Sequence, residues 1–322
     1  MKISVIIVSW NAKAFLMKCM ESVSRQSLRA SASLEIIVVD NASADGSPEA
    51  VRQSYPEVRL IVNDENYGFA KANNRGIRAS TGDYLFLINS DVVVSESCFE
   101  KSIQHMDEHP EIGMLGPRIV GLDGKVQRSC MGYPSLWNSL CRALALDSLF
   151  PRSRFFGSHL LTFWNHDETR PVEVINGCFW VLRRSAMEQV GLLDERFFIY
   201  AEDIDWCKRF NEGGWKVVFF ADVEALHYGG ASSANAPIRF HIEMQRANYQ
   251  YWTKHHSRVQ SFAFLLITFL HHSVRIIGEI AVYPLRQNRA ASAYRIKRGI
   301  ASIKWIMAME SNPAGYETTA RS

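Results

Sequence analysis

The stretch ISVIIVSW, residues 3–10, is apolar apart from two serines, and Val and Ile supply most of it. Such a run predicts a strand that is buried on both faces. Residues 12–26 follow with apolar side chains at helical spacing, and LEIIVVDN, residues 34–41, predicts a second strand. Two more strands are predicted at 58–64 and 83–91, each after a helical segment. This alternation predicts an α/β domain whose sheet is mainly parallel and covered by helices on both faces.

Polar side chains follow each of these predicted strands. They are Ser9 to Asn11, Asp40 and Asn41, Asn63 to Asn66, and Asn89 to Asp91. One such residue is typical of a turn or a helix cap. In an open α/β sheet, however, ligands bind beyond the carboxyl ends of the strands, so four polar ends together indicate a ligand site. The sequence has no GxGxxG or P-loop motif, which argues against a dinucleotide or P-loop site.

The segment LFLINSDVVV, residues 85–94, ends its apolar run on Asn89, Ser90 and Asp91. A carboxylate in this position is consistent with a metal ligand and equally with an ordinary turn. Two acids spaced one apart would favour a metal more strongly, but the first of the two positions holds an amide.

A cluster of acids, Glu202, Asp203 and Asp205, opens a helix that we expect to run to about Asn211. Acids in a first helical turn can simply complement the helix dipole. The preceding FFIYA is apolar, however, and a carboxylate beside apolar walls can be tuned to accept a proton from a hydroxyl. Two further buried strands are predicted after this helix, ending in His227, which by itself is more often structural than a ligand.

Taken in order, the motifs of residues 3–232 resemble those of inverting glycosyltransferases of family two with a GT-A fold, and within them the rhamnosyltransferase-like group. The motifs are VIIVSWN, VVDNASADGS, NYGFAKANNRGIRASTGDYLFLINSD, INGCFWVLRR, VGLLDERFFIYAEDIDWCKRFNEGGWKV and ALHYGGAS. The resemblance implies a Rossmann-like core with a mixed, mainly parallel sheet. It also implies a nucleotide-diphosphate sugar as the donor.

The resemblance implies roles for residues on the donor side of this site. Asp40 matches the acid that hydrogen-bonds the nucleotide base, and Ser9 and Trp10 lie in the matching base-binding segment. The residues that match the stretch lining the nucleoside are Asn66, Gly68 and Asn74.

For the metal, Asp91 matches the last acid of the family's DxD signature, which holds Mg²⁺ or Mn²⁺ on the donor diphosphate. Asn89 stands at the position of the first acid, so less charge is expected from the protein there. His227 matches the histidine that completes metal or diphosphate binding.

For catalysis, Asp203 matches the general base, and Glu202 and Asp205 are then expected to orient that base or to contact the acceptor. Attack by the activated hydroxyl opposite the leaving group inverts the anomeric centre without a covalent intermediate.

The composition has a net charge of +3, too small to indicate nucleic acid as a partner, and none is expected. The six cysteines show no paired spacing and predict free thiols in a reducing compartment. The N-terminus enters a strand directly, without the pattern of a signal peptide, so the catalytic part is expected in the cytoplasm.

From Arg258 onward nine Lys or Arg stand against three Glu, which indicates an acidic surface as partner.

Residues 259–287 are the most hydrophobic part of the sequence, but charged residues interrupt them before a bilayer could be spanned. A helix packed on the catalytic domain, an interfacial helix and a re-entrant segment are all compatible with this pattern. We favour peripheral attachment to the inner face of the cytoplasmic membrane, close to a lipid-linked acceptor. A short helix is predicted at 135–149, in a region that either faces the substrate or is a surface insertion.

These observations predict a catalytic domain at 1–235, a membrane-associated helical region at 236–310 and a disordered tail at 311–322. The predicted function is transfer of a sugar, rhamnose being one candidate, from a nucleotide-diphosphate sugar to a glycan or lipid-linked acceptor in cell-surface polysaccharide synthesis. The alternatives are an inactive or weakly active nucleotide-sugar-binding scaffold and a nucleotidyltransferase on a similar fold. A nucleotidyltransferase would be expected to have a Gly-rich basic loop after the first strand. The sequence has SWNAKAFL there, which is not such a loop.

Overall fold

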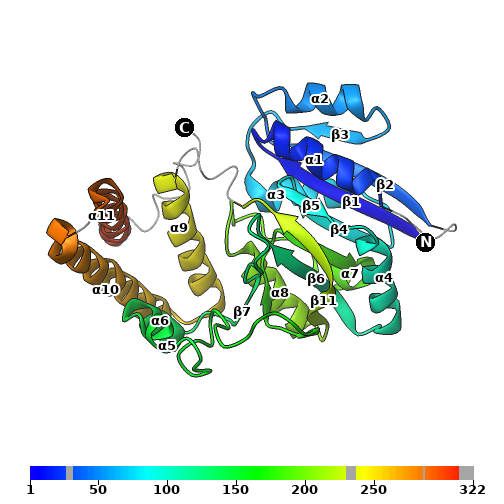
Figure 1. The fold of residues 1–322 in the computed structure, drawn as a ribbon. Coiled ribbons are helices and arrows are strands. Elements are labelled where there is room, and N and C mark those ends of the chain that lie inside the picture. The colour runs from blue at the N-terminus through cyan, green and yellow to red at the C-terminus, as the bar shows by residue number, and fades with distance from the viewer. Residues whose placement is uncertain (27–31, 230–236, 286, 312–322) are drawn as a thin grey trace. The chain divides into compact units, whose positions relative to one another are not determined.

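The computed structural model describes residues 1–26, 32–229, 237–285 and 287–311. Packing divides the chain into two compact units (Figure 1). The first unit, here the sheet unit, holds residues 1–133 and the chain from 164 to 229. The second, the helical unit, holds residues 134–163 and the chain from 237 onward. The predicted catalytic span, 1–235, therefore includes a segment that packs with the helical unit. The predicted tail lies outside the described residues apart from Ser311.

One large sheet organises the sheet unit. Its strands are β1 (Lys2–Ser9), β2 (Ser33–Asp40), β3 (Arg59–Val62), β4 (Tyr84–Asn89), β5 (Val92–Val94), β6 (Ile112–Val120), β8 (Arg170–Pro171), β10 (Phe179–Arg183) and β11 (Lys216–His227). They follow the order β3-β2-β1-β4-β10-β6-β11-β5, with β8 also paired to β11. The first four strands are parallel, as predicted. A separate pair is formed by β7 (Cys130–Met131) and β9 (Val174–Ile175).

The sheet is mixed because β10 runs antiparallel to both of its neighbours, β4 and β6. The prediction of two strands between Trp215 and Gly229 is wrong, since this segment forms the single strand β11. Its pairing with β6 slips between Phe220 and Glu224, which marks a bulge. No glycine or proline stands inside β11 to turn the chain, so the strand bends at the bulge and continues.

Helices cover both faces of this sheet, as predicted (Figure 1). They are α1 (Lys13–Ser24), α2 (Ser47–Ser54), α3 (Gly68–Ala79), α4 (Cys98–Glu108), α7 (Arg184–Val190) and α8 (Glu202–Glu212). Val5 and Ile7 belong to one core cluster with apolar residues of α1, α2 and α4. Ile6 points to the other face, where it packs so closely on Gly76 of α3 that a side chain there would collide with it. Alternate residues of one buried strand thus serve two cores.

The helical unit contains α5 (Leu136–Ala143), α6 (Leu146–Leu149), α9 (Pro237–His255), α10 (Arg258–Val282), the short 3₁₀ turn η2 (Tyr283–Leu285) and α11 (Arg289–Ser311). The helix predicted at 135–149 is broken in two, because Ala145 adopts a left-handed conformation with φ 57°. Ser257 and Gln260 form a capping box that starts α10.

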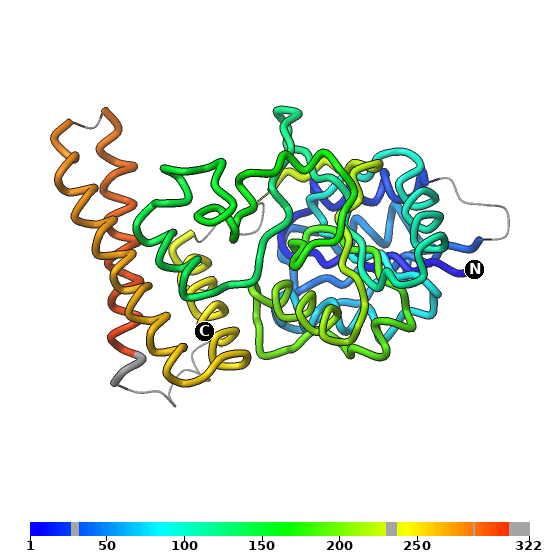
Figure 2. Tube along the Cα trace, turned by 90° about the horizontal axis from the view of Figure 1, so that it is seen from below, coloured from blue at the N-terminus to red at the C-terminus, as the bar shows by residue number. Residues whose placement is uncertain are grey.

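Helices α10 and α11 lie side by side and antiparallel (Figure 2). Glu279 of α10 links them, since it pairs with Arg295 at 3.0 Å and accepts a hydrogen bond from Ser292 at 2.6 Å. By length and composition alone, residues 258–285 could cross a membrane, and most of that stretch is not buried by the protein.

Candidate active site

Three buried polar atoms at the carboxyl ends of adjacent strands have no hydrogen-bond partner among the residues that the structure describes. They are Ser9 Oγ after β1, Asp40 Oδ1 after β2 and Asn63 Oδ1 after β3. Ser9 and Asp40 stand opposite each other in the parallel register. Because buried polar groups in folded proteins are nearly always paired, three unpaired acceptors at one sheet edge indicate a place where a polar ligand binds. Trp10 follows Ser9 directly at this edge.

Hydrogen bonds fix the other polar atoms at this edge of the sheet. Asp40 accepts the backbone N–H of Ser43 through its second oxygen at 2.8 Å. Asn63 donates to Asn41 at 2.7 Å, and Asn41 donates to the carbonyl of Gly68 at 3.1 Å. This chain of contacts ties the ends of β2 and β3 to the start of α3, so the unpaired oxygens keep fixed positions.

Gly68 must be glycine. It has φ 77°, and a Cβ there would collide with the carbonyl of Phe198. Asn66 accepts the N–H of Gly68 at 2.9 Å and thereby shapes the turn before α3. The next residue, Phe69, donates its N–H to the same Phe198 carbonyl at 2.6 Å. Asn66 and Gly68 thus bring the start of α3 against the segment that precedes the acid cluster.

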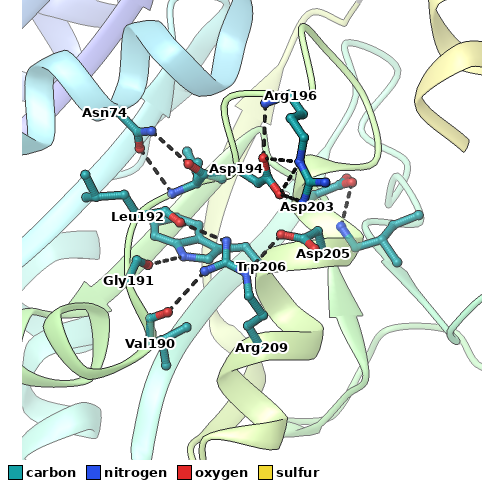
Figure 3. A network of polar contacts seen from close by, with 12 residues as sticks. Asn74, Val190, Gly191, Leu192, Asp194, Arg196, Asp203, Asp205, Trp206 and Arg209 are labelled. Atoms are coloured by element: carbon teal, nitrogen blue, oxygen red, sulfur yellow. Dashed lines mark hydrogen bonds and ion pairs between the residues drawn. The ribbon is translucent and has the colours of Figure 1, made fainter. Parts of the chain in front are cut away.

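Asn74 holds another part of that segment (Figure 3). Its amide nitrogen donates to the carbonyl of Leu193 at 2.8 Å and to Glu195 at 3.0 Å, and its amide oxygen accepts the N–H of Leu193 at 3.1 Å. The side chain is almost fully buried. Because both ends of the amide are engaged, Asn74 positions the loop after α7, and its assignment to the nucleoside remains a prediction.

Asp91 and His227 come together across a strand pair. The chain turns between β4 and β5, and β5 pairs antiparallel with the end of β11, with Val92 opposite His227. The Nε2 atom of His227 lies 3.4 Å from Oδ1 of Asp91. The N–H of Tyr228 also donates to the carbonyl of Asp91 at 3.0 Å. The two residues expected at the metal are therefore neighbours, although 135 positions separate them in the chain.

Asn89, at the end of β4, connects this pair to the acid cluster. Its N–H donates to the carbonyl of Cys178 at 3.0 Å. The backbone N–H of Gly177, one residue earlier, hydrogen-bonds Asp203. The segment 177–178 therefore has the Asn89 strand end on one side and Asp203 on the other.

The acid cluster starts α8 directly after two strained residues. Tyr200 and Ala201 adopt φ values of 72° and 61°, which cost non-glycine residues about 1–3 kcal/mol each and tend to occur at active sites. Burial raises the pKa of Asp203 to about 6, although N–H groups of Ile204 and Gly177 oppose the shift. Burial and the adjacent Asp203 charge raise the pKa of Glu202 well above its usual 4.5, and its Oε2 atom has no hydrogen-bond partner in the described part of the chain.

Asp205 faces the protein interior. It is fully buried and accepts a hydrogen bond from Nε of Arg209 at 2.9 Å. Arg209 also donates to the carbonyls of Val190 and Leu192, at 3.1 and 2.8 Å (Figure 3). Of the two roles expected for Asp205, orienting the base or contacting the acceptor, its complete burial favours the first, and the role stays a prediction. Its partner Arg209 fixes the loop after α7, so Asp205 positions this part of the site.

Three contributors to the site were not predicted from the sequence. They are Arg209, the N–H of Gly177, and Gln127, which contacts His227. Only Arg209 left a readable signal, because it stands four residues after Asp205 in a predicted helix. An isolated Gln or a backbone N–H gives no such signal in the sequence.

Comparison with known proteins shows to which protein family the chain belongs. The sequence profile of glycosyl transferase family 2 matches residues 4–191, more than half of the chain. The chain belongs to glycosyl transferase family 2. It is 31% identical over 236 residues to the N-acetylglucosaminyl-diphospho-decaprenol L-rhamnosyltransferase of Mycobacterium tuberculosis, covering 70% of this chain and 76% of that protein.

Solved structures agree on the fold. The mannosyltransferase PcManGT from Pyrobaculum calidifontis, in complex with GDP-Man and Mn²⁺, matches with a TM-score of 0.57 at 17% identity, over 95% of this chain and 86% of that chain. Residues 1–349 of S. aureus TarS match with a TM-score of 0.51 at 14% identity, over 98% and 93% of the two chains. The predicted GT-A-like fold is confirmed by these structures, and the predicted glycosyltransferase activity by the family match and the M. tuberculosis relative.

Proposed function

We propose that this family 2 glycosyltransferase is an inverting, metal-dependent rhamnosyltransferase that acts on a lipid-linked glycan at the inner face of the cytoplasmic membrane. The sugar and the acceptor class are taken from the M. tuberculosis relative. The observation that carries the mechanism is the difference among the three acids at the start of α8. Asp203 keeps some exposed surface, whereas Glu202 and Asp205 are buried.

In this mechanism Asp203 accepts the proton of the acceptor hydroxyl as the new bond forms. A pKa of about 6 keeps it ionised at neutral pH and makes it a better base than an ordinary Asp. Retention by double displacement would require a second carboxylate as nucleophile. Burial favours the protonated form of Glu202, and Asp205 pairs with Arg209 and has no exposed surface, so neither is suited to act as that nucleophile. A single base therefore supports inversion.

Asp91 and His227 are the residues that would hold the metal. Among the described residues no group of three His, Cys, Asp or Glu side chains could hold an ion. Asp91 and His227 offer one carboxylate oxygen and one imidazole nitrogen side by side. Mg²⁺ characteristically takes one or two protein ligands and fills its other positions with phosphate oxygens and water, so the pair fits. When bound there, Mg²⁺ or Mn²⁺ supplies positive charge to the leaving diphosphate.

The edge formed by β1, β2 and β3 is the proposed nucleoside site. The unpaired oxygen of Asp40 can only accept, so it suits a base edge that presents an N–H group, as thymine and uracil do at N3. A dTDP-sugar or a UDP-sugar meets this requirement, and so does a GDP-sugar through the N1–H of guanine. Ser9 and Asn63 add further polar atoms at the same edge.

The helical unit supports membrane attachment. Phe262, Leu266 and Phe269 of α10 follow helical spacing and are each more than two-fifths exposed. Basic residues are frequent from Arg258 onward. An apolar face beside basic residues is typical of a helix that lies at the surface of an anionic membrane.

A thermal-shift panel of nucleotide sugars tests the donor. A true donor raises the unfolding temperature, because ligand at one hundred times its Kd stabilises the folded protein by about 2.7 kcal/mol. We expect dTDP-rhamnose to stabilise the full-length protein, and Mn²⁺ to enhance the effect. A shift with GDP-mannose alone, or none with any nucleotide sugar, would contradict the proposal.

A further inference from the structure

Gln127 stands on a short hairpin that follows β6. Its N–H donates to the carbonyl of Ile119 at 2.8 Å, and the turn between them is closed by the N–H of Gly121 on the carbonyl of Lys125, also at 2.8 Å. A Cβ on Gly121 would come within 3.2 Å of the Gln127 amide nitrogen. The glycine therefore leaves room for this amide, and the backbone places it beside the end of β11.

Both ends of the Gln127 amide contact the same residue, His227. Its Nε2 donates to the backbone carbonyl of His227 at 2.9 Å, and its Oε1 lies 3.0 Å from Nδ1 of the imidazole ring. A carbonyl can only accept, so the first contact fixes which end of the amide is the NH₂ group. The other end is then an oxygen, which can only accept, and the ring must donate from Nδ1.

This contact determines the state of the second ring nitrogen. With the proton of the neutral imidazole on Nδ1, the lone pair stands on Nε2, 3.4 Å from Oδ1 of Asp91. Two acceptors at this distance repel each other unless a proton or a metal cation lies between them. A divalent cation bound here would be held by this nitrogen and this oxygen, and its charge would offset their repulsion.

We propose that Gln127 is a positioning residue that holds His227 in the Nδ1–H tautomer and presents its Nε2, together with Asp91, to the divalent cation of the donor diphosphate. The inference rests on the proposed metal-dependent function and adds a residue to it. Partners of this kind are common for histidine ligands, where they fix the tautomer and the ring orientation.

The test compares two substitutions in the full-length protein. Gln127→Met keeps the size of the side chain but removes both hydrogen bonds, whereas Gln127→Glu keeps an acceptor opposite Nδ1. Mn²⁺ binding is measured by electron paramagnetic resonance with dTDP present. We expect Gln127→Met to weaken binding at least about tenfold, the range seen when such partners are lost. Gln127→Glu should recover most of the affinity. The matched control is Gln104→Met on α4, where the glutamine hydrogen-bonds the exposed Glu108.

A second readout needs no metal. In protein labelled with ¹⁵N-histidine, the ring-nitrogen shifts of His227, assigned by their loss in His227→Asn, report the tautomer. We expect the Nδ1–H form in the wild type and in Gln127→Glu, and a mixture in Gln127→Met. A wild-type Mn²⁺ affinity in Gln127→Met, or an unchanged tautomer there, would overturn the inference. If the wild type itself binds no Mn²⁺, the proposed metal dependence fails, and the tautomer still decides the role of Gln127.

Discussion

At the residue scale, Asp203 and Glu202 are adjacent acids with raised pKa values and different surroundings. Asp203 is only partly buried and accepts N–H groups from Ile204 and Gly177. Glu202 is buried and leaves one oxygen unpaired. The raised pKa makes Asp203 an effective base, and the raised pKa of Glu202 favours its neutral form beside that base.

The pH dependence of transfer follows from the pKa of Asp203. Only its ionised form accepts a proton, so kcat/KM should fall about tenfold per pH unit below pH 6 and level off above it. Initial rates between pH 4.5 and 8.5 measure this profile. A flat profile across pH 6 would remove Asp203 from the role of base.

Glu202→Gln should preserve transfer, because the amide imitates a carboxyl that is already neutral. It should also change the stability profile. Since the pKa of Glu202 is higher in the folded than in the unfolded chain, the folded state keeps a proton that the unfolded state loses above about pH 4.5. Wild-type stability therefore falls as the pH rises past this value. The stability of Glu202→Gln should fall less over the same pH range, and thermal unfolding at pH 5 and pH 8 measures the difference. If both proteins lose the same stability between these pH values, Glu202 is ionised in the folded state.

At the scale of elements, α8 carries the acid cluster and also holds the loop after α7 in place. Arg209, one turn after Asp205, neutralises that buried carboxylate and holds the carbonyls of Val190 and Leu192 (Figure 3). The indole N–H of Trp206 donates to the carbonyl of Gly191 at 2.8 Å. The helix thus fixes the loop after α7 by three successive carbonyls, and Asn74 of α3 fixes it from the other side.

Arg209→Met should destabilise the protein by about 3–5 kcal/mol, because it leaves Asp205 charged and buried without its partner. Lys208→Met is the matched control, since Lys208 pairs at the same spacing with the exposed Glu212, and such surface pairs contribute about 0–1 kcal/mol. Urea unfolding measures both. The double variant Asp205→Asn with Arg209→Met should recover part of the loss. If Arg209→Met and Lys208→Met lower the free energy of unfolding equally, the assigned role of Asp205 is contradicted.

At the scale of the whole molecule, the helical unit exposes apolar side chains that a protein surface seldom presents together. Replacing Phe262, Leu266 and Phe269 by Ser should reduce cosedimentation with phosphatidylglycerol vesicles and affect neutral vesicles less. Leu122→Ser, at an exposed leucine of the sheet unit, is the control. If the triple variant binds vesicles as the wild type does, α10 is not the attachment site.

The sequence predicted the parts of the fold that local patterns control. Strands β1, β2 and β4 were expected within two residues of their bounds, because continuous apolar runs define them. The break at Ala145 and the bulge in β11 were not predicted, since both depend on packing against distant segments. Within the site, the acids and His227 were found by type and motif. Gln127 stands 100 positions before His227 in the sequence, and only the hairpin after β6 brings it there.

The most direct test of the central claim, that Asp203 is the base of a family 2 glycosyltransferase, is the activity of Asp203→Asn in the full-length protein. Transfer from dTDP-rhamnose to an N-acetylglucosaminyl-diphospho-lipid is measured with Mn²⁺ present, alongside donor binding by thermal shift. The account predicts that transfer falls at least about a hundredfold, the lower range for loss of a general base, while the donor still stabilises the variant. Transfer at the wild-type rate by a folded, donor-binding Asp203→Asn protein would contradict it.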